Sequence, residues 1–172
     1  NYTNTYSYNQ LKTDLNFNSV PTVQKFIGYL SEPYLFLNLT KYTPKLKIQQ
    51  KSPKKSYIID TGFIKARSFE LSPNWGRLLE NVVFIELIRR HYKPELDLFY
   101  YRTRNDREID FVCRKGHKAE QLIQVSYDIT NPKTLKRELT ALSEASSELD
   151  CTNLLLITWD KEEVVRINDS NI

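Results

Sequence analysis

Four polar residues in the second half of the chain have the types and spacing of a small catalytic site. Glu80 lies in a segment with helical periodicity, and Asp110 lies among apolar residues whose alternation predicts a strand. Gln124 and Ser126 lie two residues apart in another predicted strand, so their side chains leave the same face of that strand. A carboxylate with apolar neighbours is costly unless it pairs with a cation, accepts hydrogen bonds or binds a metal. The pattern therefore predicts a polar site built from these four residues.

The helices that must position this site have recognisable start and stop signals. Ser72-Pro73 offers a capping hydroxyl followed by Pro at the first helical position, and the predicted helix runs to about His91. Its predicted buried stripe consists of Leu79, Val82, Val83 and Leu87. A second amphipathic helix is predicted over 134–149. Leu135, Leu139 and Leu142 are expected to face inward, and Lys136, Arg137 and Glu138 to face mostly outward.

The strands predicted around these helices complete an α/β layered domain over residues 63–172. Strands are predicted over 96–102, 108–114, 121–127, 153–159 and 164–167. The dense apolar run over 153–159 is typical of a buried central strand. An order of helix, three strands, helix and strand (αβββαβ) predicts helices packed on a sheet, within a chain that is α+β overall.

The first 62 residues predict two short helices followed by a β-hairpin. The segment 9–17 has apolar residues on one helical face, and Asn18-Ser19 with Pro21 signals the start of a second helix. A strand and the two arms of a hairpin are predicted over 34–39, 45–50 and 56–60. This order predicts a winged-helix domain over residues 1–62, which either binds DNA or makes protein–protein or inter-domain contacts.

A basic stretch supplies the main candidate for a contact with a polyanion. Between Lys41 and Ile59 there are six lysines and no acid. The alternative interpretation is a solvated edge hairpin that lysines protect against strand pairing. If the segment binds nucleic acid, the predicted contacts lie on the second helix and on the hairpin: Thr22, Gln24, Lys25, Lys45, Lys47, Lys51, Lys54 and Lys55.

Composition excludes several classes of function. The 172 residues are 40% apolar and include 11 Tyr, 8 Phe and 2 Trp, which argues for a folded core and against disorder. No apolar run is long enough to cross a membrane. Two Cys and two His show no zinc-type spacing, so a reduced cytoplasmic setting is expected. The four glycines form no phosphate-binding loop, so no ATP site is expected within this chain. The chain begins with Asn and contains no Met, which predicts a fragment of a longer protein.

Four motifs in register resemble a known family. They are Gly76-Arg-Leu-Leu-Glu-Asn81, Tyr101-Arg102, Arg107-Glu-Ile-Asp-Phe-Val112 and Gln121-Leu-Ile-Gln-Val-Ser126. Together they resemble the C-terminal domain of uncharacterised function found in a large family of prokaryotic AAA-type ATPases. The junction from Ser52 to Gly62 is also typical of that family. The resemblance implies a P-loop ATPase domain upstream, then a winged helix, then a domain with the PD-(D/E)XK restriction-endonuclease-like fold.

The resemblance also implies roles for the four site residues. In active nucleases of that fold an acid like Glu80 assists the site, an Asp like Asp110 binds Mg²⁺, and an acid two residues before a lysine completes it. Here Gln124 and Ser126 stand at the acid and lysine positions. A lysine from a neighbouring element, such as Lys118 or Lys136, would have to replace the missing one. Otherwise Glu80 and Asp110 form an inherited polar network with Arg102 or Arg104 as ion-pair partners.

Three functional hypotheses follow. The leading one is a DNA-binding, non-cleaving accessory region of an AAA-type ATPase, with duplex DNA and the upstream ATPase domain as partners and with ATP and Mg²⁺ bound upstream. The second is a protein-interaction or self-association module. The third is a Mg²⁺-dependent nuclease centred on Glu80 and Asp110. No cofactor within this chain and no membrane contact are expected, and Tyr100, Tyr101 and Trp159 are expected to pack in the core and not to stack on bases.

Overall fold

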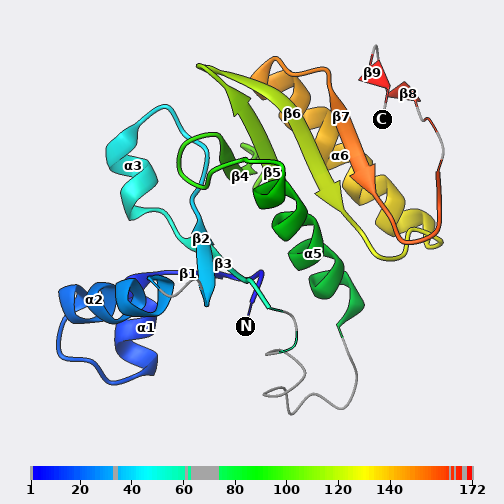
Figure 1. Ribbon diagram of the computed structural model, residues 1–172. Helices are drawn as coiled ribbons and strands as arrows, with labels where there is room; N and C mark the ends of the chain where they lie inside the picture. The colour runs from blue at the N-terminus through cyan, green and yellow to red at the C-terminus, as the bar shows by residue number, and fades with distance from the viewer. Residues whose placement is uncertain are drawn as a thin grey trace.

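Three β-sheets and five helices make up the part of the chain that the structure describes (Figure 1). The structure is a computed structural model, and it describes residues 2–32, 35–60, 62, 74–162, 164, 166–167 and 170–171. The α/β layered class predicted from the sequence is confirmed. No helix among these residues is long and apolar enough to cross a lipid bilayer.

The N-terminal sheet has the strand order β1-β3-β2, and both pairings are antiparallel. Its strands are β1 (Thr5–Tyr6), β2 (Phe36–Leu39) and β3 (Lys54–Ile58). Helices α1 (Tyr8–Asp14) and α2 (Val20–Ser31) lie between β1 and β2 in the chain. The predicted cap of α2 is confirmed, because Ser19 Oγ accepts a hydrogen bond from the Thr22 N–H at 3.3 Å and Pro21 lies in the first turn.

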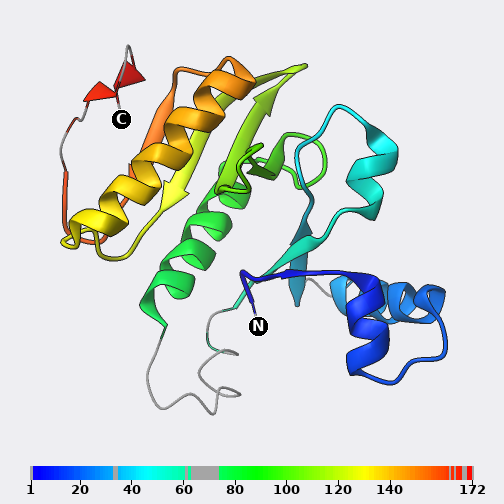
Figure 2. The same cartoon turned by 180° about the vertical axis from the view of Figure 1, so that it is seen from behind.

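The predicted β-hairpin is wrong. Its first arm is a short helix, α3 (Leu46–Lys51), and its second arm, β3, pairs with β1 and β2. Leu, Lys and Gln are good helix formers, and Pro44 lies just before the helix, so local propensity explains the difference. The basic stretch is therefore a helical arm followed by a central strand (Figure 2). The predicted strand start at Tyr34 lies outside the described residues.

The C-terminal sheet has the order β4-β5-β6-β7. Its strands are β4 (Leu98–Arg102), β5 (Glu108–Lys115), β6 (Lys118–Val125) and β7 (Leu154–Ile157). The first three are antiparallel, and the helix α6 (Pro132–Leu149) connects β6 to β7, which run parallel. Gly116 has a φ of 61° in the β5–β6 turn, which favours glycine there. The strand β7 is an edge strand of this sheet and not the predicted central one, and Leu155 is accordingly 38% exposed.

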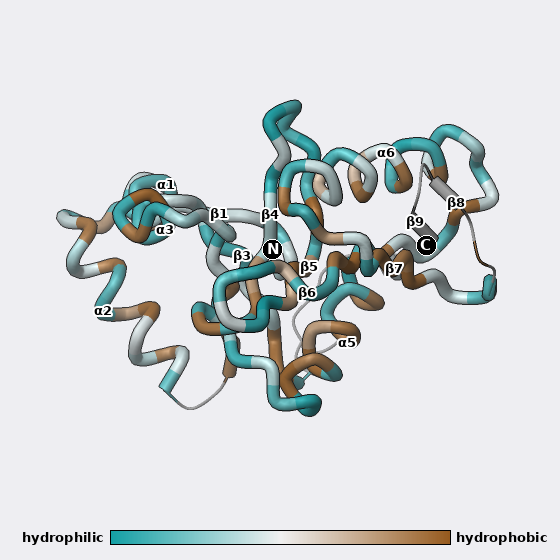
Figure 3. The backbone as a smooth tube through the Cα atoms, turned by 90° about the horizontal axis from the view of Figure 1, so that it is seen from above, coloured by the Kyte–Doolittle hydropathy of each residue, from teal (hydrophilic) through white to brown (hydrophobic). Residues whose placement is uncertain are grey.

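Helices cover both faces of this sheet. The helix α5 (Trp75–Arg89) packs on one face, where Phe84 and Leu87 meet Phe111 of β5, and α6 packs on the other, where Leu142 meets Leu122 of β6. Figure 3 shows hydrophobic residues gathered along α5 and β7. The predicted stripe of α5 needs one correction, since Val82 is 48% exposed and Asn81 is buried instead. The predicted Ser72-Pro73 start lies outside the described residues. The observed N-cap of α5 is Asn74, whose side chain accepts a hydrogen bond from the Arg77 N–H. After β7, the strands β8 (Arg166–Ile167) and β9 (Ser170–Asn171) form a short antiparallel pair.

The two halves of the chain share one hydrophobic core. Leu39 of β2 and Tyr57 of β3 belong to the same buried cluster as α5. The rings of Tyr57 and Phe84 stack with centroids 4.0 Å apart. The division into domains 1–62 and 63–172 stays a prediction, and the residues on either side of it contribute to a common interior.

Candidate functional site

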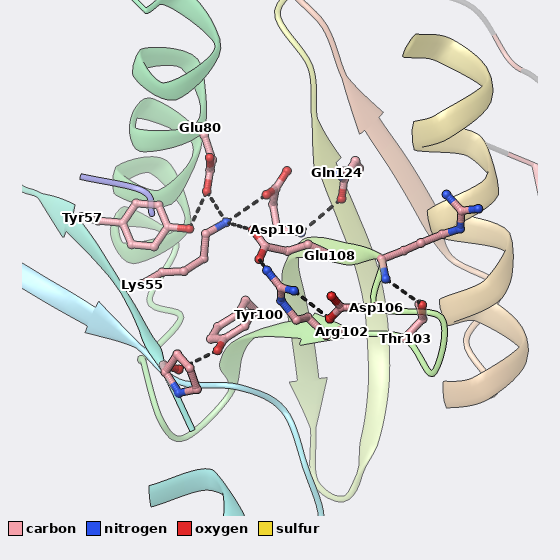
Figure 4. Close-up of polar contacts among 12 residues, drawn as sticks. Lys55, Tyr57, Glu80, Tyr100, Arg102, Thr103, Asp106, Glu108, Asp110 and Gln124 are labelled. Carbon is pink, nitrogen blue, oxygen red and sulfur yellow. Dashed lines mark hydrogen bonds and ion pairs between the residues drawn. The ribbon is translucent and has the colours of Figure 1, made fainter. Parts of the chain in front are cut away.

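A buried lysine lies at the centre of the candidate site. The Nζ atom of Lys55 is 2.7 Å from Glu80 Oε1, 2.8 Å from Glu108 Oε1 and 3.0 Å from Asp110 Oδ1 (Figure 4). Only 1% of the Lys55 side chain is exposed. One ammonium group therefore compensates three carboxylates in a region with little access to water.

Three elements bring these groups together. The strand β3 is hydrogen-bonded on both sides, to β1 and β2, so the position of Lys55 is fixed by two strand partners. Lys55 and Tyr57 leave the same face of β3, toward α5. Glu80 lies one helical turn before Phe84, whose ring stacks on Tyr57, and Asp110 enters from β5. The packing of Tyr57 against Phe84 thus sets the distance between Lys55 and Glu80.

Glu80 is a carboxyl group whose pKa is raised by its surroundings. Its Oε1 atom accepts hydrogen bonds from both Lys55 Nζ and the Tyr57 hydroxyl, each at 2.7 Å. Burial, together with the charge of Asp110, raises the pKa of Glu80 to about 7 in spite of Lys55. Burial likewise raises the pKa of Asp110. Burial acts to lower the pKa of Lys55, but the surrounding acidic groups outweigh it and hold the pKa well above its ordinary value.

A second group of hydrogen bonds links Asp110 to α6. Asp110 Oδ2 accepts from the Val125 N–H at 2.9 Å, and the Asp110 N–H donates to Gln124 Oε1 at 3.1 Å. Gln124 Nε2 then donates to Glu138 Oε2 at 2.8 Å, and Arg137 pairs with the other oxygen of Glu138. Glu138 is 5% exposed, so its predicted outward orientation is wrong. Hydrogen bonds to Gln124 and Arg137 satisfy its buried charge.

A polar cavity of about 450 Å³ opens onto this second group. Its walls come from the β4–β5 turn, the ends of β5 and β6, and α6: Asn105, Asp106, Arg107, Glu108, Asp110, Gln124, Arg137, Glu138 and Ala141. Four acids and two arginines give its lining a negative balance, which by itself repels phosphate groups.

The structure brings three of the four predicted site residues together and leaves one aside. Glu80, Asp110 and Gln124 belong to one network through Lys55 and the Asp110 backbone. The Ser126 hydroxyl instead donates to the Asp128 carbonyl at 3.3 Å. The residues that sequence reasoning missed as partners are Lys55 and Tyr57 from β3, Glu108 from β5 and Glu138 from α6.

The ion-pair partners suggested from the sequence are wrong. Arg102 pairs with Asp106 at 2.7 Å and with Glu108 at 3.1 Å, and the Arg104 N–H donates to Glu148. Lys118 and Lys136 are exposed. The lysine that reaches Glu80 and Asp110 is Lys55. The signal for it was its position two residues before Tyr57 in a strand with a buried face.

The predicted nucleic-acid contacts divide into buried and exposed residues. Lys54 and Lys55 were predicted to contact phosphates, but they are only 9% and 1% exposed. That prediction is therefore wrong for these two lysines. Lys54 Nζ lies 3.8 Å from Glu95 and over the Tyr8 ring. The other predicted contacts were expected on the second helix and the hairpin. Most of them are exposed: Gln24, Lys25, Lys45, Lys47 and Lys51. Thr22 is partly buried, and its hydroxyl is hydrogen-bonded to Ser19.

The described residues do not form a ready metal site. Among them, no group of three His, Cys, Asp or Glu side chains is arranged to hold a metal ion. The ammonium of Lys55 lies among the carboxylates of Glu80, Glu108 and Asp110, where a divalent cation would have to bind. The donor set therefore fits an internal ion cluster better than Mg²⁺.

The three aromatic residues that were predicted to pack in the core differ in how far they are buried. Tyr100 is buried, and its hydroxyl donates to the Pro53 carbonyl at 2.5 Å. Tyr101 packs partly buried against the core under α6. Trp159 is 65% exposed, so its predicted place in the core is wrong.

Comparison with known proteins gives a family but no described activity. Residues 75–172 match the family described as a domain of unknown function (DUF4143). An uncharacterised protein of Methanocaldococcus jannaschii is 36% identical over 151 residues, which cover 86% of this chain and 32% of that protein. An uncharacterised protein of Haemophilus influenzae is 31% identical over 108 residues, which cover 63% of this chain and 26% of that protein. The chain thus spans about a third or less of these curated relatives, and no solved structure matches it.

Proposed function

We propose a function for this chain, which belongs to the DUF4143 family. In this proposal it is a nucleic-acid-binding accessory region of a larger ATPase, and it does not cleave the nucleic acid. The observation that carries the second half of this proposal is the position of Lys55. Metal-dependent cleavage needs a divalent cation between carboxylates, and here an ammonium group already lies between Glu80, Glu108 and Asp110. The site then acts as a structural junction between β3, α5 and β5.

The resemblance of the motifs to the C-terminal part of AAA-type ATPases supports the larger parent protein. The region shared with this chain is about a third of the first relative and about a quarter of the second, which leaves room for an ATPase domain. In this proposal ATP and Mg²⁺ bind to that other domain and not to the region described above. The protein is proposed to lie in the cytoplasm.

The order of the N-terminal elements supports a winged helix. The chain runs β1, α1, α2, β2, α3, β3, and the sheet order is β1-β3-β2. Two helices followed by a pair of antiparallel strands match a winged helix in which α3 takes the place of the wing tip. The proposed recognition helix is then α2, which presents Gln24 and Lys25.

The proposed contact with phosphates is made chiefly by α3 and its first flanking residue. Lys45, Lys47 and Lys51 are exposed, and none forms an ion pair with another described residue. Lysines without acidic partners are free to exchange counterions for phosphates, which makes binding depend steeply on salt. These three side chains are therefore the proposed phosphate contacts.

The test is fluorescence anisotropy of a labelled DNA duplex over a salt series. The variant in which Lys45, Lys47 and Lys51 are all Ala should bind more weakly, and its slope of log affinity against log salt should be shallower by roughly 2 to 3. A matched variant with Lys93, Lys118 and Lys136 changed to Ala removes three exposed charges elsewhere and should retain the wild-type slope. Equal slopes for the two triple variants would remove α3 from the proposal.

A protein-docking role is the second candidate, and the apolar residues of α3 favour it. Leu46 is 66% exposed and Ile48 is 49% exposed, and they alternate with the lysines. Exposed apolar and basic residues on one arm suit an acidic protein surface or a second copy of this chain. Light scattering that gives a concentration-dependent mass, together with no DNA binding, would support this candidate.

A metal-dependent nuclease is the third candidate, and Lys55 is also the observation that favours it. The resemblance implies a lysine near the acids, and Lys55 supplies one from β3 in place of Ser126. This candidate requires cleavage of DNA in Mg²⁺ or Mn²⁺ that disappears in Asp110→Asn.

A further inference from the structure

Three aromatic side chains form a ladder at the end of the C-terminal sheet where β6 and β7 finish. The ring centroids of Trp75 and Tyr127 are 6.0 Å apart with planes at 21°, and those of Tyr127 and Trp159 are 5.6 Å apart with planes at 32°. The outer members are exposed, Trp75 by 49% and Trp159 by 65%. They are the two tryptophans of the chain.

The topology explains why these rings meet. Because β6 and β7 run parallel, their carboxyl ends lie at the same end of the sheet (Figure 1). Tyr127 follows the end of β6, and Trp159 follows the end of β7. Trp75 begins α5, which packs on the same sheet. The ladder lies just beyond Val125, whose N–H binds Asp110. It is therefore a neighbour of the carboxylate network along β6.

Two tryptophans are exposed in this part of the chain, Trp75 and Trp159. Burying a large aromatic side chain is favourable, so leaving two of them half exposed forgoes that stabilisation. The ring of Tyr127 contacts both tryptophan rings, and its plane lies at 21° to that of Trp75 and at 32° to that of Trp159. The partner that fits the next position in such a ladder is another flat π system.

We propose that Trp75, Tyr127 and Trp159 stack on unpaired nucleobases of single-stranded nucleic acid. This inference rests on the proposed function and specifies its ligand as a strand with unstacked bases, at a duplex end or in a single-stranded segment. Every base has a π face, so recognition of this kind tolerates any sequence.

The charge around the three rings differs from the charge on α3, so the two proposed contacts with nucleic acid should respond differently to salt. Within three positions of the three rings, the sequence has the bases Arg77 and Lys161 and the acids Asp128, Asp160 and Glu162. The charge near the rings in sequence is therefore not positive, so stacking and not phosphate attraction must supply the affinity at the ladder. Substitution of a ladder residue should consequently weaken binding with no change in the salt slope, the opposite of the α3 variant.

The test is a titration of the 172-residue chain with a short oligo-thymidine strand, followed by tryptophan fluorescence. Stacking on Trp75 or Trp159 should quench the emission. Trp159→Ala should weaken single-strand binding about fivefold or more, and Trp159→Phe, which keeps a ring, should lose less. Leu96→Ala removes a residue of comparable exposure (56%) elsewhere and should bind as the wild type does.

The outcomes distinguish this inference from the proposed function. Duplex binding with a steep salt slope, but no quenching by the single strand and no effect of Trp159→Ala, would overturn the ladder and leave the proposed function standing. Quenching that Trp159→Ala abolishes, with no effect of the α3 triple variant, would support the ladder and remove α3. No binding of either nucleic acid would overturn both.

Discussion

Lys55 of β3 and Glu80 of α5 lie 25 positions apart in the sequence, and their Nζ and Oε1 atoms are 2.7 Å apart in the folded chain. This ion pair joins the two halves of the chain, because Lys55 belongs to the N-terminal sheet and Glu80 to the helix that covers the C-terminal sheet. Tyr57 stacks on Phe84, and the Asn81 side chain makes two hydrogen bonds to the backbone of Ile58 at the same junction. The candidate site is thus the place where the two halves are held together.

Removing the charge of Lys55 should destabilise the whole chain. In Lys55→Met the carboxylates of Glu80, Glu108 and Asp110 lose the cation that compensates them, and a buried pair broken on one side costs about 3–5 kcal/mol. Urea denaturation followed by circular dichroism measures the free energy of unfolding. Lys45→Met, on the exposed arm, should change it by less than about 0.5 kcal/mol. Equal stability of the two variants would show that Lys55 is not a structural cation.

Stability should fall as the pH rises from about 5 to 8, with a contribution from Glu80. Its pKa is about 7 in the folded chain against an ordinary value of 4.5. Between these values the folded state holds a proton that the unfolded state has lost, so the free energy of unfolding decreases as the pH rises through that window. Asp110, whose pKa is also raised, acts in the same direction.

The Glu80→Gln variant isolates this contribution. Its amide oxygen can still accept from Lys55 and Tyr57, but the group does not titrate. The decrease in stability between pH 5 and pH 8 should therefore be smaller than in the wild type, as measured by urea denaturation at each pH. Parallel pH profiles for the two proteins would contradict a raised pKa at Glu80.

Asn81→Ala should destabilise the junction without changing any charge. The Asn81 amide accepts from the Ile58 N–H at 2.9 Å and donates to the Ile58 carbonyl at 2.8 Å, and Asn81 is fully buried. Leaving these two backbone groups without partners costs about 1–3 kcal/mol each. Thermal unfolding measures the loss, and Asn105→Ala, in the β4–β5 turn, provides the control. A melting temperature equal to that of the control would show that the N–H and carbonyl groups of Ile58 find other partners.

Incubation with DNA in Mg²⁺ or Mn²⁺ should leave the DNA intact. The ammonium of Lys55 competes with a divalent cation for the same carboxylate oxygens, and Gln124 adds no charge. Gel electrophoresis of a labelled duplex provides the readout, with Asp110→Asn as the comparison. Cleavage by the wild type that Asp110→Asn abolishes would replace the non-cleaving account by the nuclease.

The parts predicted correctly from the sequence are those specified locally. Ser19 and Pro21 mark the start of α2, and alternation along β5 places Asp110 in a strand. Both inferences use neighbours within a few residues. The proximity of Glu80, Asp110 and Gln124 was instead implied by the resemblance, since these residues lie up to 44 positions apart in the sequence.

The parts that were missed depend on contacts between distant segments. Lys55 carries no local sign that it will be buried, because a lysine in a basic stretch reads as solvated until β3 is placed between β1 and β2. Glu138 reads as an outward residue of α6 because only Gln124, 14 positions away, gives its charge a buried partner. The segment at Leu46 alternates like a strand, yet its intrinsic propensity is helical.

The measurement that tests the central claim most directly is the anisotropy of a labelled duplex with the wild-type chain, in Mg²⁺, from about 50 to 200 mM salt. The account predicts binding that weakens steeply over this range, with an intact duplex recovered from the same samples. Unchanged anisotropy at the lowest salt would contradict it and would direct attention to a protein partner for the basic arm.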